Sequence, residues 1–205
     1  MVSPAATAFT SLTLSASFRL QKRLATDGRC CQADAGWPQF CMPISVEHER
    51  LRQAAVELLE PGDFEGTAYD DITRRASELC DAPVAIITVM DGNSQFFRSR
   101  VGTDLMSRPR ELTFCTHALR DPERITIVED ASTDARFATN PVVTGAPYIR
   151  FYAGVPLMFH GQAIGTLCVF DVKPRTLQAK QLEELRFLAT QVMETLQARH
   201  APHAE

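Results

Sequence analysis

The sequence lacks any long apolar run, and no stretch approaches the ~20 residues that a membrane-spanning helix needs. It also lacks a CxxC pair, and the six cysteines show no spacing typical of a zinc site. Clusters of lysine and arginine are missing as well, because 21 basic residues are balanced by 25 acidic ones, for a net charge of -4. Phosphate backbones are bound by clustered basic side chains, so we expect no nucleic-acid partner, no membrane partner and no metal site.

The size of the chain makes structural disulfides unnecessary. With 205 residues, of which 45% are hydrophobic, it suits one soluble domain that buries roughly 70% of its unfolded surface. Cys30, Cys31 and Cys41 lie close together near the N-terminus, whereas Cys80, Cys115 and Cys168 lie singly among apolar neighbours. We therefore expect reduced thiols and a cytoplasmic protein.

The first 43 residues differ in composition from the rest. They carry no acidic residue before Asp27 and are rich in Ser, Thr and Ala, with basic residues at Arg19, Lys22 and Arg23. This composition resembles an organelle transit peptide. The alternative is an unstructured extension translated from too early a start codon, with Met42 just before the folded part. Under either interpretation we expect residues 1–43 to be disordered and residues 44–200 to form a single domain.

Three segments have the apolar periodicity of helices. The first covers residues 45–61, where Ser45 can cap the start and Pro61 ends the pattern. A second helix is predicted to begin near Thr67. The last segment has an apolar seam that either packs on its own sheet or pairs as a two-stranded coiled coil with a second subunit. The seam consists of Leu182, Leu185, Ala189, Val192 and Leu196.

The strands are predicted as hairpins. Residues 84–90 are almost all apolar, as at the centre of a sheet, and residues 91–93 read Asp-Gly-Asn, a turn sequence. Gly154 and Gly165, inside later strands, indicate bulges or close backbone approach. Further strands are expected over residues 95–101, 124–130, 149–159 and 163–171. Hairpins flanked by helices predict an α+β fold with a mainly antiparallel sheet.

Five segments, in this order, resemble the GAF domain. They read YDDITRRASELCDAPVAIITVMDGNSQFFRSRVG, SRPRELTFCTHAL, VEDASTDARFATNPVV, IRFYAGVPL and IGTLCVFD. The resemblance covers about residues 46–198. It implies a sheet of five or six strands, with N- and C-terminal helices on one face and loops that close over a pocket on the other.

The GAF domain is a sensor module of bacterial signalling proteins. The resemblance therefore implies a non-enzymatic regulatory module that binds a small molecule and relays the change through its terminal helices. It also implies a homodimer through those helices and a histidine kinase or diguanylate cyclase as output partner. One alternative is a dimerisation or protein-interaction module whose vestigial pocket is filled by side chains. Another is a redox enzyme of the free methionine sulfoxide reductase type, although the elements that carry the cysteines match no pattern of that enzyme.

The stretch ELTFCTHALRD contains the most suggestive pair, Cys115 and His117. Residues two apart on a helix point about 200° apart, so the spacing does not make a catalytic dyad. A buried cysteine in an apolar run is ordinarily a small hydrophobic residue. GAF domains that carry bilins place the histidine directly after the cysteine, and Cys-Thr-His departs from this by one residue. We therefore expect neither a bilin nor catalytic residues, and the ligand itself stays unnamed.

The loop VEDASTDARFATNP and the strand after it complete the expected pocket. Asp130 and Asp134 can cap a turn, Arg136 can pair with one of these acids, and Phe137 is a candidate lid residue. The acids can equally serve only to hold the shape of the loop. The residues expected at the pocket are Phe114, Cys115, His117, Asp130, Phe137, Tyr148, Phe151 and Tyr152.

Overall fold

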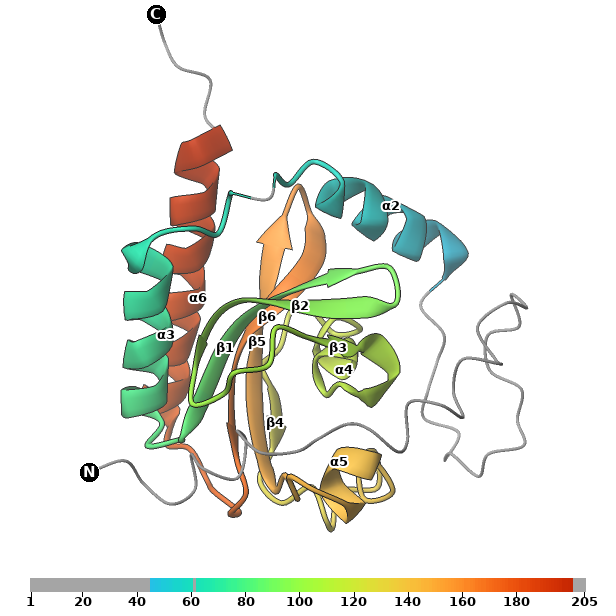
Figure 1. The fold of residues 1–205 in the computed structure, drawn as a ribbon, viewed down its shortest axis with the longest axis vertical. Helices are drawn as coiled ribbons and strands as arrows, with labels where there is room; N and C mark the ends of the chain where they lie inside the picture. Colours follow the sequence, from blue (N-terminus) through green and yellow to red (C-terminus); the bar gives the residue numbers. More distant parts are fainter. Residues whose placement is uncertain (1–44, 61, 201–205) are drawn as a thin grey trace, which may run out of the picture.

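A computed structural model describes residues 45–60 and 62–200, so the extension expected to be disordered lies outside the described residues. The described part contains one six-stranded sheet in the order β3-β2-β1-β6-β5-β4 (Figure 1). Every neighbouring pair of strands is antiparallel. The strands are β1 (Val84–Asp91), β2 (Ser94–Val101), β3 (Ser107–Pro109), β4 (Thr126–Val128), β5 (Phe151–Phe159) and β6 (Gln162–Asp171).

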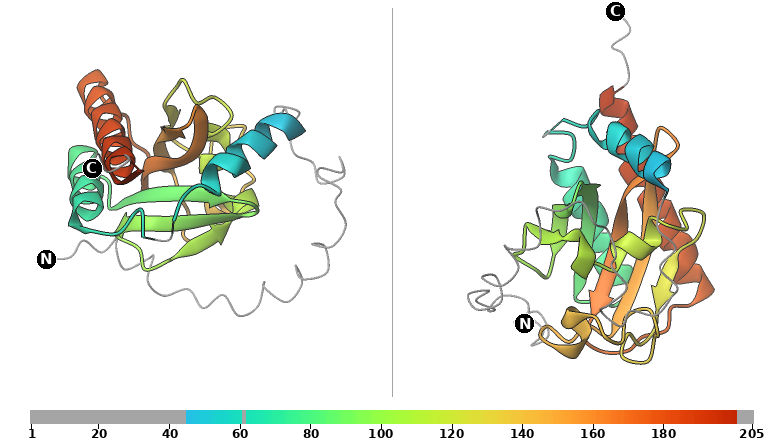
Figure 2. Two further views of the ribbon diagram at one scale, coloured as in Figure 1. Left: turned by 90° about the horizontal axis from the view of Figure 1, so that it is seen from above. Right: turned by 90° about the vertical axis from the view of Figure 1, so that its right-hand side faces the viewer.

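Helices cover the sheet on both faces. Two views show α3 and α6 side by side on one face (Figures 1 and 2). The short helices α4 and α5 contribute to a separate core on the opposite face. The helix α2 contacts β1 and β6. The helices are α2 (Val46–Val56), α3 (Thr67–Leu79), α4 (Cys115–Ala118), α5 (Pro141–Thr144) and α6 (Ala179–His200). The predicted α+β fold is confirmed.

The central strand β1 is buried on both faces, as its apolar sequence predicts. Successive side chains of a strand point to opposite faces, so its residues serve two cores. Ala85, Ile87 and Val89 join the helix-side core, whereas Ile86 and Met90 join the other. Both faces of the sheet must therefore be covered.

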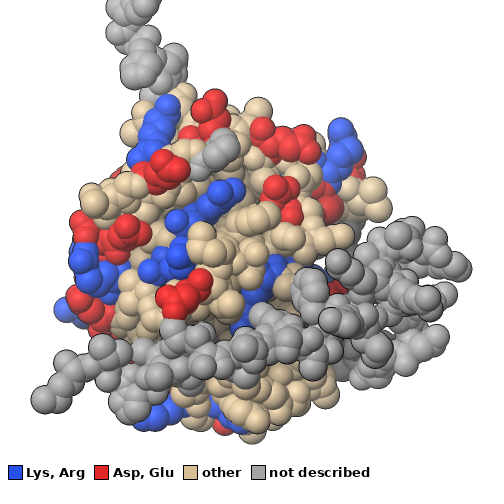
Figure 3. Space-filling view, in the orientation of Figure 1, with Lys and Arg blue, Asp and Glu red and all other residues tan. Residues whose placement is uncertain are grey.

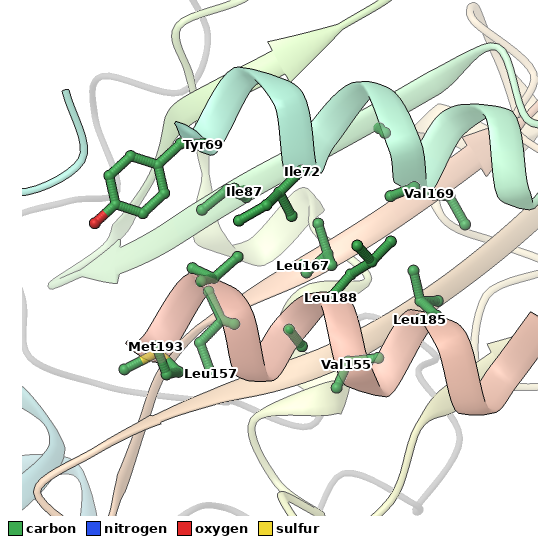
Figure 4. Close-up of a cluster of buried hydrophobic side chains, with 14 of the residues drawn as sticks. Tyr69, Ile72, Ile87, Val155, Leu157, Leu167, Val169, Leu185, Leu188 and Met193 are labelled. Carbon is green, nitrogen blue, oxygen red and sulfur yellow. The ribbon is translucent and has the colours of Figure 1, made fainter. Parts of the chain in front are cut away.

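The helix-side core holds α6 and α3 onto the sheet (Figure 4). Leu185 and Leu188 of α6 and Ile72 of α3 pack above Leu157 and Leu167 of the sheet. Burying one such side chain stabilises a fold by about 1.5–3 kcal/mol. The seam predicted for the last helix faces this sheet, and most of it is buried. Its pairing with a second subunit stays a prediction.

Two elements differ from the prediction. The strand β3 was not expected, because three residues that end in a proline carry no alternating pattern; it forms by pairing with β2. The first helix begins as predicted, with Ser45 Oγ accepting from the amide of His48. It ends at Val56 rather than near Pro61. A turn replaces its last residues, and there Asp63 accepts a hydrogen bond from the backbone amide of Glu60.

A charged cluster, Glu49, Arg52 and Arg110, ties α2 to the sheet. Arg52 is only 1% exposed, and its guanidinium donates to the carbonyl oxygen of Met90 at the end of β1 and to the carboxylate of Glu49. Arg110, in the 3-10 turn Arg110–Leu112, donates to the same carboxylate, with Nη2 2.9 Å from Oε2. Glu49 thus joins α2 to the segment that follows β3.

Replacing Glu49 by glutamine should lower the free energy of unfolding by about 1.5–3 kcal/mol, because two guanidinium groups lose a charged acceptor. Burial raises the pKa of Glu49, but hydrogen bonds from Arg110 and Arg52 outweigh it and lower this pKa from 4.5 to about 2. The stabilisation is therefore complete above pH 4.5 and is lost as the pH falls towards 2. Urea unfolding from pH 7 to pH 2 measures both effects.

The matched control is Glu47→Gln on the same helix, whose pair with Arg50 is exposed. It should leave stability unchanged. Equal effects of the two substitutions would contradict the role given to Glu49.

Candidate ligand site

The core on the loop side of the sheet is built around stacked aromatic rings. Phe114 stacks on Phe137 with ring centroids 4.3 Å apart and on Tyr152 at 5.3 Å. Tyr152 lies 5.0 Å from Phe170 in turn. Such pairs add about 0.5–1.5 kcal/mol each beyond the area they bury. Phe114, Phe137 and Tyr152 are buried in this core, and the partly buried Phe170 packs against it.

A narrow cavity remains beside Phe114. Its volume is about 30 Å³, and a single water molecule needs about 10–15 Å³, so it holds roughly two. Its polar lining comes from Gln95, Thr103, Arg108 and Thr113. The apolar wall includes Val84, Ile86, Phe97, Val142 and Ile149.

Two adjacent residues with hydrogen-bond donors, Gln95 and Arg108, line this cavity. Gln95 of β2 is 3% exposed, and its Nε2 has no hydrogen-bond partner among the described residues. Arg108 of β3 is paired with it in the strand register. Burial lowers the pKa of Arg108, yet an arginine keeps its charge at neutral pH. The side chain of Arg108 is half-buried, and it is the one charged side chain in the lining of the cavity. The cavity is therefore suited to an anion.

Two cysteines meet beside the aromatic rings. Cys115 begins α4 and Cys168 lies in β6; both are fully buried, and their sulfur atoms are 3.8 Å apart. The hydroxyl of Thr166 donates to Cys115 Sγ at 3.2 Å. The residues are 53 positions apart, so no spacing in the sequence indicates this contact. It arises only when α4 packs on the sheet.

The surroundings of the three buried cysteines give their thiols different pKa values. Burial raises the pKa of Cys115, but the neighbouring polar groups of Cys168, Thr166, Tyr152 and Gln95 lower it, with a net fall to about 7. Burial raises the pKa of Cys168 well above its ordinary value. Cys80, in the helix-side core, has a pKa raised by burial to about 11. Cys115 is therefore the most readily ionised of the three.

The structure brings together several of the expected pocket residues. Phe114 lines the cavity, Phe137 and Tyr152 stack on it, and Cys115 is buried in the same core. His117 is half-buried, with its ring centroid 4.6 Å from that of Phe137. Burial, with the nearby charges of two arginines, lowers the pKa of His117 to about 4, so its ring is neutral at pH 7. It packs against the aromatic rings and does not line the cavity.

Three expected residues lie elsewhere, and their placement at the pocket is corrected. Phe151 belongs to the helix-side core, because strand alternation points it away from the face of Tyr152. Tyr148 precedes β5 and is 53% exposed. Asp130 is exposed, and its Oδ1 accepts hydrogen bonds from the amide and hydroxyl of Ser132. It holds the shape of the loop, as does Arg136, which binds Asp134 at 2.6 Å.

The polar residues of the cavity were not expected from the sequence. The sequence did contain one indication that Gln95 is buried. Gln95 and Phe97 share a face of a predicted strand, and the apolar Phe97 was expected to point into the core. An amide on a buried face needs a partner. Arg108 carried no comparable signal, because its position depends on the unpredicted strand β3.

The sequence model of the GAF domain matches residues 65–196. The chain belongs to the GAF domain family. This GAF chain is 39% identical over 156 residues to a cyclic di-GMP phosphodiesterase of Pseudomonas aeruginosa. The match covers 74% of the chain but 26% of that protein, so the chain spans about a quarter of the relative's length.

Solved GAF structures share its fold. The GAF domain of an Acinetobacter phosphoenolpyruvate-protein phosphotransferase is 18% identical, with a TM-score of 0.55 over 77% of this chain and 95% of the other. A free methionine-R-sulfoxide reductase from Neisseria meningitidis, solved with its substrate, is 14% identical, with a TM-score of 0.55 over 76% and 89%. At these identities the likeness establishes the fold alone.

Acidic and basic side chains are interspersed over the face seen in Figure 3. Within residues 45–60 and 62–200, no group of three or more His, Cys, Asp or Glu residues is arranged to hold a metal ion. No helix in this part of the chain is long and apolar enough to span a bilayer.

Replacing Gly154 by alanine should disturb the aromatic rings. A Cβ at this position would lie 2.0 Å from the hydroxyl oxygen of Tyr152, so the tyrosine would have to move. Overpacking of this kind costs about 1–3 kcal/mol, measurable by urea unfolding. Gly62→Ala is the matched control, since its Cβ would meet nothing within 4 Å. An unchanged stability of the Gly154 variant would show that Tyr152 is not confined as described.

Proposed function

We propose that this GAF chain is a regulatory module of signal transduction, not an enzyme, and that its cavity binds a small anion. The observation that carries this proposal is the pairing of Arg108 and Gln95 at the cavity, where the Nε2 of Gln95 is buried without a hydrogen-bond partner among the described residues. A carboxylate could accept two parallel hydrogen bonds from the guanidinium and one from the amide. The small volume favours a short monocarboxylate, with its apolar end towards Phe97 and Ile149.

The segment that lines the cavity also holds α2, which suggests a route for the signal. Arg108 and Thr113 line the cavity, and Arg110 between them binds Glu49 of α2. A ligand shifts such an equilibrium only by its differential affinity for two states. An anion that draws Arg108 inward would move Arg110 and thereby change the position or order of α2.

The output of the module is inferred from its relative. The Pseudomonas protein is named a cyclic di-GMP phosphodiesterase, and this chain matches a quarter of it. We infer that the chain acts in the cytoplasm on an enzyme of cyclic dinucleotide turnover or on a histidine kinase. We also infer that it dimerises through its terminal helices, where Phe187 of α6 is 54% exposed.

A second candidate function is a protein-interaction module with a filled pocket. The contacting rings of Phe114, Phe137, Tyr152 and Phe170 favour it, because they pack together in the loop-side core where a ligand would otherwise bind. Native mass spectrometry of the gently purified chain distinguishes the two candidates. Extra mass that is lost on denaturation supports ligand binding. A dimer without extra mass, together with no response to added carboxylates, supports the interaction module.

Substituting Arg108 by glutamine should weaken anion binding roughly 10- to 100-fold, because a hydrogen-bonded charge contributes about 1.5–3 kcal/mol. The probes are acetate, butyrate and hexanoate, and the measurement is the ligand-dependent rise in melting temperature. Arg124→Gln is the matched control, because that side chain is 82% exposed. The proposal fails if none of the three probes stabilises the wild type, or if both variants bind equally.

Substituting Arg110 by glutamine should leave carboxylate binding intact but abolish the effect of the ligand on α2. The affinity for the stabilising carboxylate should stay within about twofold, because Arg110 does not line the cavity. Ligand-induced protection of the α2 amides, measured by hydrogen–deuterium exchange, should be lost, since the bond to Glu49 is broken. Protection of α2 that persists in this variant would rule out the Arg110–Glu49 route.

A further inference from the structure

The thiol pair of Cys115 and Cys168 has no role in the proposed anion site. Both side chains are fully buried, and their sulfur atoms lie 3.8 Å apart. A disulfide has a sulfur–sulfur distance of about 2.05 Å, so the two atoms must approach by about 1.8 Å. Rotation of two unbranched side chains covers a distance of this order. The pair is thus within reach of a disulfide without being one.

Donors without other acceptors surround one of the two sulfur atoms. The hydroxyl of Tyr152 and the Nε2 of Gln95 are both buried and have no hydrogen-bond partner among the described residues. Both groups are close enough to Cys115 to influence its ionisation, as is the hydroxyl of Thr166 at 3.2 Å. A neutral thiol is a weak acceptor, whereas a thiolate accepts strongly. These donors are satisfied best when Cys115 is ionised.

We propose that Cys115 and Cys168 form a peroxide-reactive dithiol, in which Cys115 is the nucleophile and Cys168 the resolving thiol. The oxidant is hydrogen peroxide or a small hydroperoxide. The cavity of about 30 Å³ that Gln95 lines is large enough for hydrogen peroxide, which is about the size of two water molecules. This inference shares Gln95 and the cavity with the proposed anion site, but it rests on the two sulfur atoms, and its test uses no carboxylate.

The reaction balances in two steps. The Cys115 thiolate attacks one oxygen of the peroxide and the O–O bond breaks. The product is a sulfenic acid, and the hydroxide that leaves takes up a proton to become water. Cys168 sulfur then attacks the sulfenic sulfur, the S–O bond breaks, and the hydroxyl leaves as water with the proton of Cys168. Two thiols lose two electrons in total, and one peroxide becomes two waters.

The resulting bond would join the start of α4 to the middle of β6. Cys115 directly follows Phe114, which lines the cavity, so the bond would restrain that wall. The thiolate fraction needed for the first step is available near neutral pH, because the polar groups around Cys115 lower its pKa to about 7. Cys80 has no second cysteine near it in the described part of the chain and serves as an internal reference.

The test uses the full chain with Cys30, Cys31 and Cys41 replaced by serine, treated with one equivalent of hydrogen peroxide at pH 7. Alkylation under denaturing conditions and peptide mass spectrometry then locate each thiol. We expect a cross-linked peptide that joins Cys115 to Cys168, formed about 100-fold faster or more than any oxidation of Cys80. No cross-link at ten equivalents, or oxidation of Cys80 at the same rate, would overturn the proposal.

Single substitutions assign the two roles. In Cys168→Ser, a dione reagent should trap a sulfenic acid on Cys115. In Cys115→Ser, Cys168 should stay reduced, and its oxidation at the wild-type rate would overturn the assignment. Tyr152→Phe should slow the reaction at pH 7 and move its pH profile upward, because one donor to the thiolate is lost. Circular dichroism verifies folding, and the peptide map of the parent chain decides the proposal even where a variant fails to fold.

Discussion

The burial of β1 on both faces is the constraint on which the rest of the molecule depends. An apolar strand at the centre of a sheet has to be covered twice, once for each set of alternating side chains. On one face the long helices α3 and α6 provide a regular cover, and their apolar stripes match the sheet. On the other face the chain offers only α4, α5 and loops. Aromatic rings, which bury the most area for each residue, supply what those short elements lack.

This division explains why the candidate site lies where it does. Short helices and loops do not cover a sheet without gaps, and the gap beside Phe114 is the cavity. Backbone that follows β3 forms one wall of this cavity, and Arg110 in the same backbone anchors α2 through Glu49. The long helices, by contrast, are held mainly by the apolar side chains of the helix-side core. Under the proposed function, a signal that started in the cavity would therefore reach α2 more directly than α6.

The sequence predicted the elements whose patterns are local. The apolar run of β1, the turn after it and the seam of α6 each act through neighbours in the sequence, and each was confirmed. Phe114, Phe137 and Tyr152 were predicted near a pocket from family resemblance and lie together. Arg108 was missed because its strand exists only through pairing with β2, and the contact of Cys115 with Cys168 depends on tertiary packing. The predicted position of Phe151 at the pocket was wrong, because adjacent residues of a strand point to opposite faces of the sheet and Phe151 directly precedes Tyr152.

The buried hydroxyl of Tyr152 links the aromatic core to the thiol pair. Its hydroxyl is buried without a hydrogen-bond partner among the described residues, which costs about 1–3 kcal/mol, and phenylalanine would fill the same space without this cost. Gly154 is also unfavourable inside a strand, but it alone leaves room for that hydroxyl. Two unfavourable residues that act together indicate a compensating interaction. The proposed Cys115 thiolate would supply it, because a hydroxyl that is unsatisfied beside a neutral thiol would then donate to a charge. The same group that weakens the resting core would then stabilise the reactive form of the site.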